Sequence, residues 1–232
     1  MLPHLRPLLP LLILAAAPAL AQAPLRVVIG EPTSKSGDER GAHAVGLILR
    51  SAGLSYTLSR EPPERALVNF RAGRYDIDGA RTADFDKAVP GAIRVEPALM
   101  QIAVRAFGRA GLPGPTAWAD LARHRIAYVR GQRSVEYRLP PGQPAKAVTT
   151  PASCLGMAAI GRVDYCVIVA VPRDALQGTR VPLHGSVIER IPLHLWAGPG
   201  REALARTLGE ALRANIANGE LARVLAAPQT AP

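Results

Sequence analysis

The chain contains few aromatic residues, few lysines and few cysteines for its length. Aromatic residues make up only 4 % of its 232 residues, so aliphatic side chains must fill the core. Lysine occurs only at Lys35, Lys87 and Lys146, and arginine supplies nearly all of the positive charge. The arginines are scattered, with no block of five or six like charges and no interleaved aromatic residues. This pattern argues against a nucleic-acid-binding protein despite a formal net charge of +10.

Cysteine occurs only twice, at Cys154 and Cys166. We expect the first on a helix and the second on the strand that follows it, and the chain turns back between them. Packed layers can hold two Cα atoms beyond the ~7 Å that a disulfide tolerates. The sequence therefore leaves two states open: a disulfide, which an oxidising compartment permits, or two buried free thiols. No motif ties either thiol to a histidine or an acid, which argues against a catalytic cysteine.

The spacings of common metal and catalytic sites are also missing. His43, His124, His184 and His194 show no metal-ligand spacing, and no Gly-x-Ser-x-Gly turn surrounds a serine. We therefore expect no metal, no cofactor and no enzymatic activity.

The one long apolar run lies at the N-terminus. Arg6 precedes a stretch of apolar residues at 8–17, and Ala19-Leu20-Ala21 fits the small-x-small rule for signal peptidase. The alternative is an uncleaved membrane anchor, but the run is shorter than the ~20 residues that span a bilayer. We expect residues 1–21 to be a signal peptide, the mature chain to begin at Gln22, and its net charge to be +9.

One sequence pattern occurs twice in the mature chain. Residues 66–77 (ALVNFRAGRYDI) return in altered form as residues 154–165 (CLGMAAIGRVDY), about 88 positions later. Each copy reads as the end of a helix, a Gly-Arg-x-Asp turn and the start of a buried strand, because glycine tolerates the left-handed conformation that ends helices. We expect Asp76 and Asp164 to fix these turns, and the repeat predicts two lobes of similar α/β build.

Hydrophobic patterning predicts strands alternating with helices, which indicates mainly parallel sheets. The expected strands are 25–30, 54–59, 76–80, 92–96, 99–107, 125–129, 147–149, 163–170 and 187–196. The expected helices are 42–52, 64–72, 152–159, 201–218 and 220–226. A short helix capped by Thr116 is also expected, as is a helix that follows the turn 130–134 and runs through Tyr137. Ligands of such sheets bind beyond the carboxyl ends of the strands.

In these features the chain resembles the periplasmic solute-binding proteins of polar amino-acid ABC transporters. The resemblance rests on the strand 25–30, the segment 66–76, Trp118-Ala119-Asp120-Leu121 before 125–131, the turn 161–164, and Asn218-Gly219-Glu220. It spans nearly all of the mature chain.

The resemblance implies an α/β, two-lobed periplasmic-binding-protein-like (type II) fold with two crossover strands, near residues 97–105 and 186–195. Lobe 1 would comprise 22–100 and 188–232, and lobe 2 would comprise 101–187. It also implies a periplasmic, monomeric protein that captures a small polar, anionic solute between the lobes and delivers it to the membrane subunits of an ABC permease.

Arg81 is the leading candidate for holding that solute. It ends a buried strand, and a guanidinium grips a carboxylate through two parallel hydrogen bonds. The alternative is a structural pair with Asp78 or Asp84. The Thr-x-x-Arg segment and the ligand-binding Asp of typical amino-acid binders are missing here, and Ile168 and Val169 stand where that Asp is expected. These departures argue against an α-amino acid as the solute.

Other candidates lie in loops. Arg130, Gly131, Arg133 and Ser134 lie between a strand and a helix, where free backbone N–H groups favour an anion; the alternative is an ordinary surface turn. Glu31 is a candidate for a cation or hydroxyl, or for capping a turn, and Glu96 is a candidate ligand or hinge residue.

Two other functions remain open from the sequence. One is an exported sensor or partner-binding module with a degenerate cleft. The other is a dehydratase-like enzyme, which rests on fold analogy alone.

Overall fold

The computed structural model describes residues 23–30, 39–169 and 181–227. The strands are β1 (Leu25–Gly30), β2 (Tyr56–Glu61), β3 (Ile77–Arg81), β4 (Ile93–Arg94), β5 (Met100–Arg109), β6 (Ile126–Val129), β7 (Ala145–Val148), β8 (Tyr165–Ile168) and β9 (Leu183–Ala197). The helices are α1 (Arg40–Ser51), α2 (Pro63–Arg71), α3 (Arg133–Glu136), α4 (Pro151–Ala159), α6 (Glu202–Ala217) and α7 (Glu220–Ala226), with 3-10 turns η1 (Phe85–Lys87) and η2 (Trp118–Leu121). The predicted signal peptide lies outside the described residues.

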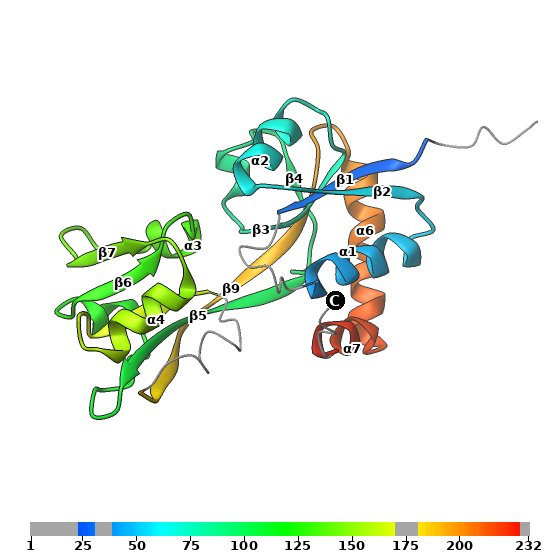
Figure 1. Cartoon of the computed structure of the whole chain (residues 1–232). Helices are drawn as coiled ribbons and strands as arrows, with labels where there is room; N and C mark the ends of the chain where they lie inside the picture. The colour runs from blue at the N-terminus through cyan, green and yellow to red at the C-terminus, as the bar shows by residue number, and fades with distance from the viewer. Residues whose placement is uncertain (1–22, 31–38, 170–180, 228–232) are drawn as a thin grey trace, which may run out of the picture.

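Two long strands, β5 and β9, run diagonally between two α/β lobes (Figure 1). They pair antiparallel from Met100 opposite Leu193 to Arg109 opposite Leu183. One end of β9 continues beside β3 in lobe 1, and β5 continues beside β8 in lobe 2, so the hydrogen-bonded path is β2-β1-β3-β9-β5-β8-β6-β7. The ninth strand, β4, pairs with β9 beside this path. The sequence predicted crossover strands, but it did not predict that they would join the strands of both lobes into one curled, nine-stranded sheet.

Within each lobe the central strands are parallel, as expected. In lobe 1, β1 lies between β2 and β3, and in lobe 2, β6 lies between β7 and β8. The predicted strand 54–59 begins two residues later than expected, at Tyr56. The antiparallel partners are the two crossover strands, because a chain that leaves one lobe and later returns runs in opposite directions through the junction.

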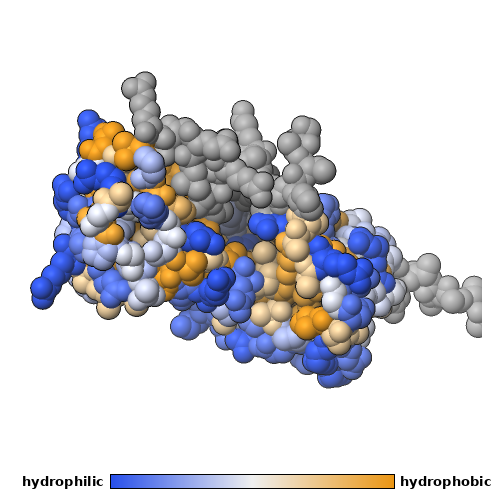
Figure 2. All heavy atoms as spheres, turned by 90° about the horizontal axis from the view of Figure 1, so that it is seen from below, coloured by the Kyte–Doolittle hydropathy of each residue, from blue (hydrophilic) through white to orange (hydrophobic). Residues whose placement is uncertain are grey.

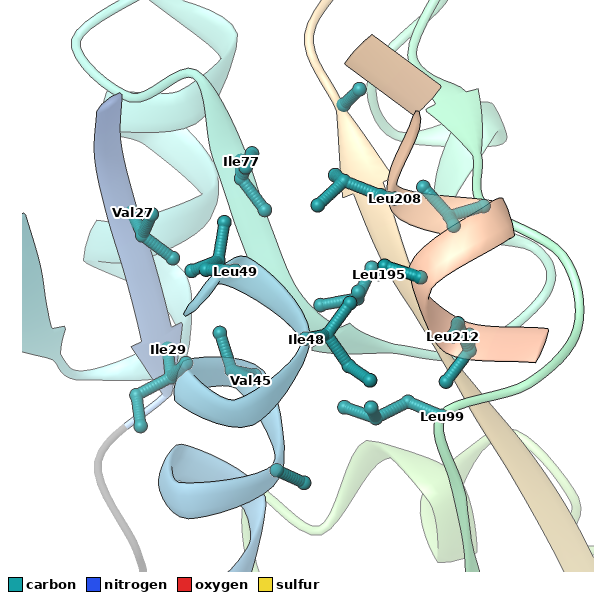
Figure 3. Packing of buried hydrophobic residues seen from close by; sticks show 14 of the residues in the cluster. Val27, Ile29, Val45, Ile48, Leu49, Ile77, Leu99, Leu195, Leu208 and Leu212 are labelled. Atoms are coloured by element: carbon teal, nitrogen blue, oxygen red, sulfur yellow. The ribbon is translucent and has the colours of Figure 1, made fainter. Parts of the chain in front are cut away.

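The larger core of lobe 1 lies between its sheet and the helices α1, α6 and α7, and a smaller cluster packs around Phe70, Phe85 and Trp196. Figure 3 shows Ile48 and Leu49 of α1 pointing toward Ile77 and Leu195 of the sheet, with Leu208 of α6 close by. All five side chains are fully buried. Since an aliphatic side chain gains ~1.5–3 kcal/mol on full burial, this cluster holds the C-terminal helices on lobe 1.

Lobe 2 has separate cores on the two faces of its sheet, and one of them contains both cysteines. Cys154 of α4 and Cys166 of β8 form a disulfide with their Cα atoms 5.4 Å apart. They pack with Phe107, Leu155 and Ile168. Of the two states that the sequence left open, the structure adopts the disulfide, because α4 lies directly on β8 without an intervening layer.

The two Gly-Arg-x-Asp turns are held in the same way in both lobes. Asp76 accepts hydrogen bonds from the backbone and side chain of Arg26, and Asp164 accepts them from the backbone and side chain of Arg125. Each backbone bond measures 2.8 Å. In both cases the arginine lies at the start of the strand that stands between the two others of its lobe, β1 in lobe 1 and β6 in lobe 2. The expectation that these carboxylates fix the turns is confirmed.

Both carboxyl groups have lowered pKa values. Burial alone would raise the pKa of Asp76, but hydrogen bonds from Arg26 and the charge of Arg201 outweigh burial and hold the pKa below its ordinary value. The hydrogen bond from the Arg125 side chain lowers the pKa of Asp164 against the smaller effect of burial. These carboxylates therefore stabilise the fold above the unfolded pKa of about 4, and this contribution is lost as the pH falls through the folded pKa.

Replacing Asp164 by asparagine is expected to lower the free energy of unfolding at pH 7 by about 1–3 kcal/mol, because charged hydrogen bonds to Arg125 are lost. The deficit should shrink as the pH falls below the unfolded pKa of about 4 and toward the lowered folded pKa, where the wild-type carboxylate becomes protonated. Urea unfolding at pH 7 and in this acidic range measures it. Asp76→Asn should behave alike, and Asp86→Asn, at an exposed carboxylate, should change little. A deficit that stays constant with pH would contradict this account.

No helix within the described residues combines the length and apolar character needed to cross a bilayer.

Candidate functional site

A recess separates the two lobes on the face shown in Figure 2. Strand β2 of lobe 1 and strand β6 of lobe 2 end toward it, since Glu64 and Arg133, which follow these ends, contact one another across the lobes. The parallel strand β3 ends beside them, since Arg81 at its end contacts Pro63. The carboxyl ends of parallel strands are the usual place for ligands in α/β proteins. The recess is therefore the candidate functional site.

Arg81 lies at this end of β3 and is held by its own lobe. Its Nε donates to both carboxylate oxygens of Asp78, at 3.0 and 2.9 Å, and its Nη2 donates to the carbonyl of Pro63 at 3.2 Å. The guanidinium also lies 5.2 Å from the ring centroid of Phe85. The structure thus forms the pair with Asp78 that the sequence offered as the alternative, whereas Asp84 binds Thr82.

Asp78 is fully buried and fixes the orientation of Arg81. Burial raises the pKa of the Asp78 carboxyl, and the charge of Arg81 opposes this rise. An irregularity in the pairing of β3 with β9 lies between Asp78 and Arg81. Because Nε is occupied, only the terminal nitrogens of Arg81 remain to meet a solute.

The turn 130–134 in lobe 2 differs from its prediction in one respect. Its backbone N–H groups were expected to be free for an anion, but that of Gly131 donates to the carboxylate of Glu136 at 2.8 Å. The N–H groups of Arg130, Gln132 and Arg133 bond to backbone carbonyls. In addition, α3 is only four residues long. Of the N–H groups of this turn, only that of Ser134 is left without an acceptor within the described residues, so this turn offers an anion mainly its side chains.

Arg130 and Arg133 are the two exposed cations of the turn. Arg130 makes no side-chain hydrogen bond or ion pair within the described residues, whereas Arg133 makes several. Gln132, between them, is buried, and its Oε1 accepts from the N–H of Val169 at the end of β8. The ends of β6 and β8 are therefore tied together where the lobe faces the recess.

Arg133 makes a side-chain contact between the two lobes. Its Nη2 donates to Oε1 of Glu64, in the first turn of α2, at 2.8 Å. The preceding residue, Pro63, is the one whose carbonyl accepts from Arg81. Guanidinium groups from both lobes thus reach neighbouring residues at the start of α2.

Sequence reasoning missed several residues at this junction. Arg138 and Trp118 both donate to the carboxylate of Glu189 on β9, at 2.7 and 2.8 Å. The charge of Arg138 also contributes, after the larger effect of the Thr82 hydroxyl, to lowering the pKa of Asp84 in lobe 1. Tyr137, 70 % exposed, accepts from Arg133. No local motif marks Arg138, and the motif that contains Trp118 does not indicate its partner, because Glu189 lies far away in the sequence. Tyr137 lies one helical turn after Arg133 and could have been found from that spacing.

The remaining candidates lie elsewhere. Glu31 falls outside the described residues. Glu96 lies between β4 and β5, where it forms an ion pair with Arg94 at 2.6 Å and approaches His194 to 3.5 Å. Its carbonyl accepts from Arg213 of α6. Glu96 is thus placed at the entry to a crossover strand, as a hinge residue would be, and its role in ligand binding remains a prediction.

Two surface cavities lie at the opposite ends of the lobes, away from the recess. The larger, of about 490 Å³, lies beside Arg125, Lys146 and Arg162 at the start of β6 and β7. The other, of about 360 Å³, lies beside Asp76 and Arg201. Both flank the Gly-Arg-x-Asp turns. The strand starts that they border are not where α/β sheets usually bind ligands.

No model of a protein family matches the chain, and no curated protein sequence matches it. Solved structures do match. The ligand-binding core of GluR0 in complex with L-glutamate is 13 % identical, with 88 % of this chain and 97 % of that chain covered and a TM-score of 0.66. A probable amino-acid ABC transporter extracellular-binding protein, YtmK of Bacillus subtilis, is 14 % identical, with coverages of 86 % and 95 % and a TM-score of 0.64.

A third similar structure is a histidine kinase sensor domain described as similar to periplasmic binding proteins. It is 18 % identical, with 86 % of this chain and 93 % of that chain covered and a TM-score of 0.65. At these identities the likeness establishes the fold. The predicted two-lobed, type II periplasmic-binding-protein-like fold is confirmed, and the similar structures include both transport proteins and a sensor.

Proposed function

We propose that the chain is an exported, periplasmic solute-binding protein that captures a small polar, anionic solute between its lobes and delivers it to an ABC permease. The observation that carries the proposal is the convergence of Arg81 and Arg133 on Pro63 and Glu64. Two guanidinium groups from opposite lobes suit an anion held between them, since arginine binds carboxylates and phosphates with directed hydrogen bonds.

The mechanism follows from the fold. Two crossover strands permit the lobes to move as units, and hinge closure around a ligand is a known motion of such proteins. When the lobes part, a solute reaches Arg81 on lobe 1, and closure brings Arg130 and Arg133 of lobe 2, the latter of which otherwise contacts Glu64 of lobe 1, onto its other side. Water leaves the recess on closure, which strengthens the charge interactions inside it. The solute is held without a chemical change.

A thermal-shift screen of amino acids, organic acids and other small metabolites tests the proposal. A bound solute at 100 times its dissociation constant should stabilise the protein by ~2.7 kcal/mol. Arg133→Gln should weaken this effect for anionic compounds, whereas Arg206→Gln, on the exposed side of α6, should not. Absence of stabilisation by every compound would contradict solute capture.

A second candidate function is an exported sensor module, favoured by the structural likeness to a histidine kinase sensor domain. Such a module would signal to a partner instead of releasing solute to a permease. Co-purification with permease subunits would favour transport, whereas binding to a kinase would favour sensing. Turnover of any bound compound on long incubation would overturn both in favour of an enzyme.

A further inference from the structure

The Glu64 carboxylate is paired with Arg133, the cation of lobe 2 that an anionic solute would need. Glu64 lies in the first turn of α2, exposed over 67 % of its side chain, and its partner among the described residues is Arg133. The two residues belong to different lobes. The carboxylate therefore reaches across the recess to a guanidinium that the opposite wall presents.

Arg133 is held ready for a carboxylate by residues of its own lobe. Its Nη1 donates to the Tyr137 hydroxyl at 2.8 Å, and its guanidinium lies 5.5 Å from the centroid of that ring. Glu136 approaches its Nε at 4.0 Å. These contacts orient the side chain and leave Nη2 for Glu64. An oriented guanidinium loses less conformational freedom on binding an anion than a free one.

We propose that Glu64 is a specificity-determining residue of the recess: its carboxylate holds Arg133 in the solute-free protein, and a solute that brings its own carboxylate or similar anion replaces it. The exchange leaves Arg133 paired throughout. A neutral solute cannot make this exchange, because it would have to leave the arginine without a counter-charge or leave the Glu64 contact in place. This inference rests on the proposed function and names the charge of its solute.

The exchange predicts that removing the charge of Glu64 strengthens anion binding. In Glu64→Gln, Arg133 no longer has an internal carboxylate competing for it. Because exposed ion pairs are weak, the gain should be at most about fivefold in affinity. The matched control is Glu220→Gln, which breaks an exposed pair with Arg223 of 2.9 Å on α7.

The experiment uses acetate as the simplest carboxylate and acetamide as its neutral analogue. The Nε–Hε NMR resonance of Arg133 is followed during titration of the mature wild type, Glu64→Gln and Glu220→Gln. Acetate should shift this resonance at lower concentration in Glu64→Gln than in the other two proteins, and acetamide should shift it in none. Equal acetate affinity in all three proteins, or no response to acetate in any, would overturn the proposal.

A second measurement reads the lobe contact without any added compound. In small-angle X-ray scattering, Glu64→Gln and Arg133→Glu should each increase the radius of gyration, and Glu64→Arg combined with Arg133→Glu should restore it. Failure of the double variant to restore the wild-type value would also overturn the proposal. Both measurements are independent of the solute screen, so a failed screen and a failed exchange at Glu64 are distinguishable.

Discussion

Replacing Arg81 by methionine is expected to lower the free energy of unfolding at pH 7 by about 3–5 kcal/mol, because it leaves a fully buried carboxylate without its counter-charge. The Asp78 side chain is 0 % exposed, and that of Arg81 is only 18 % exposed. Methionine keeps an unbranched apolar side chain at this position but removes the charge. Urea unfolding measures the loss.

The same variant should show a distinctive pH dependence. The pKa of Asp78 is already raised by burial, and removing Arg81 takes away the main opposing effect. A carboxyl whose folded pKa exceeds its unfolded value binds more protons when folded, so its contribution to stability falls as the pH rises. The variant should therefore approach wild-type stability near pH 4 and fall furthest behind at neutral pH.

The matched control for this prediction is Arg65→Met. Arg65 is exposed on α2 and makes no ion pair within the described part of the chain, so its replacement should change stability by less than about 0.5 kcal/mol. An Arg81→Met protein as stable as wild type at pH 7 would show that Asp78 is neutral in the folded state. The prediction also has a practical consequence: loss of solute binding in an Arg81 variant has to be separated from loss of fold.

Breaking the disulfide is expected to have the second-largest effect. Cys154 and Cys166 are 12 residues apart in sequence, and a cross-link closing a loop of about this length stabilises a protein by about 2–4 kcal/mol, chiefly by restricting the unfolded chain. Both residues are fully buried between α4 and β8. The double variant Cys154→Ala/Cys166→Ala should therefore unfold at a distinctly lower urea concentration.

Reduced wild-type protein separates the bond from the packing. Dithiothreitol opens the disulfide but leaves both sulfur atoms in the core, so the reduced protein should lose most, but not all, of what the alanine variant loses. Ser153→Ala, one residue before Cys154 and exposed, serves as the substitution control. If reduction leaves the unfolding midpoint unchanged, the cross-link contributes nothing to stability.

Much of the fold could be predicted because its signals are local. The order of helices and strands follows from hydrophobic periodicity, and the two Gly-Arg-x-Asp turns follow from glycines that adopt φ of 69° at Gly73 and 75° at Gly161. Even the function of Asp76 and Asp164 was accessible, because a carboxylate just before a buried strand lies close to the backbone of its neighbour.

The site was less predictable. The sequence placed Arg81 at the end of β3. It could not predict that Arg81 pairs with Asp78 and not with Asp84, since both lie three residues away in the sequence. The N–H of Gly131 was expected to be free, but the short α3 brings Glu136 back onto it. Tyr137 and Glu64 were not predicted as site residues, because no neighbouring residue in the sequence indicates that they lie near the opposite lobe.

By itself the sequence determined two lobes of similar build, their parallel strands and the two turns of the repeat. The signals for these features are local: each is carried by residues of one helix, one strand or one turn. Only the tertiary structure decided that Cys154 meets Cys166, that β5 and β9 join both lobes into one sheet, and that Glu64 of one lobe meets Arg133 of the other. These contacts depend on how the layers and lobes are spaced. That spacing is set by the packing of many side chains together, and no short segment of the chain encodes it.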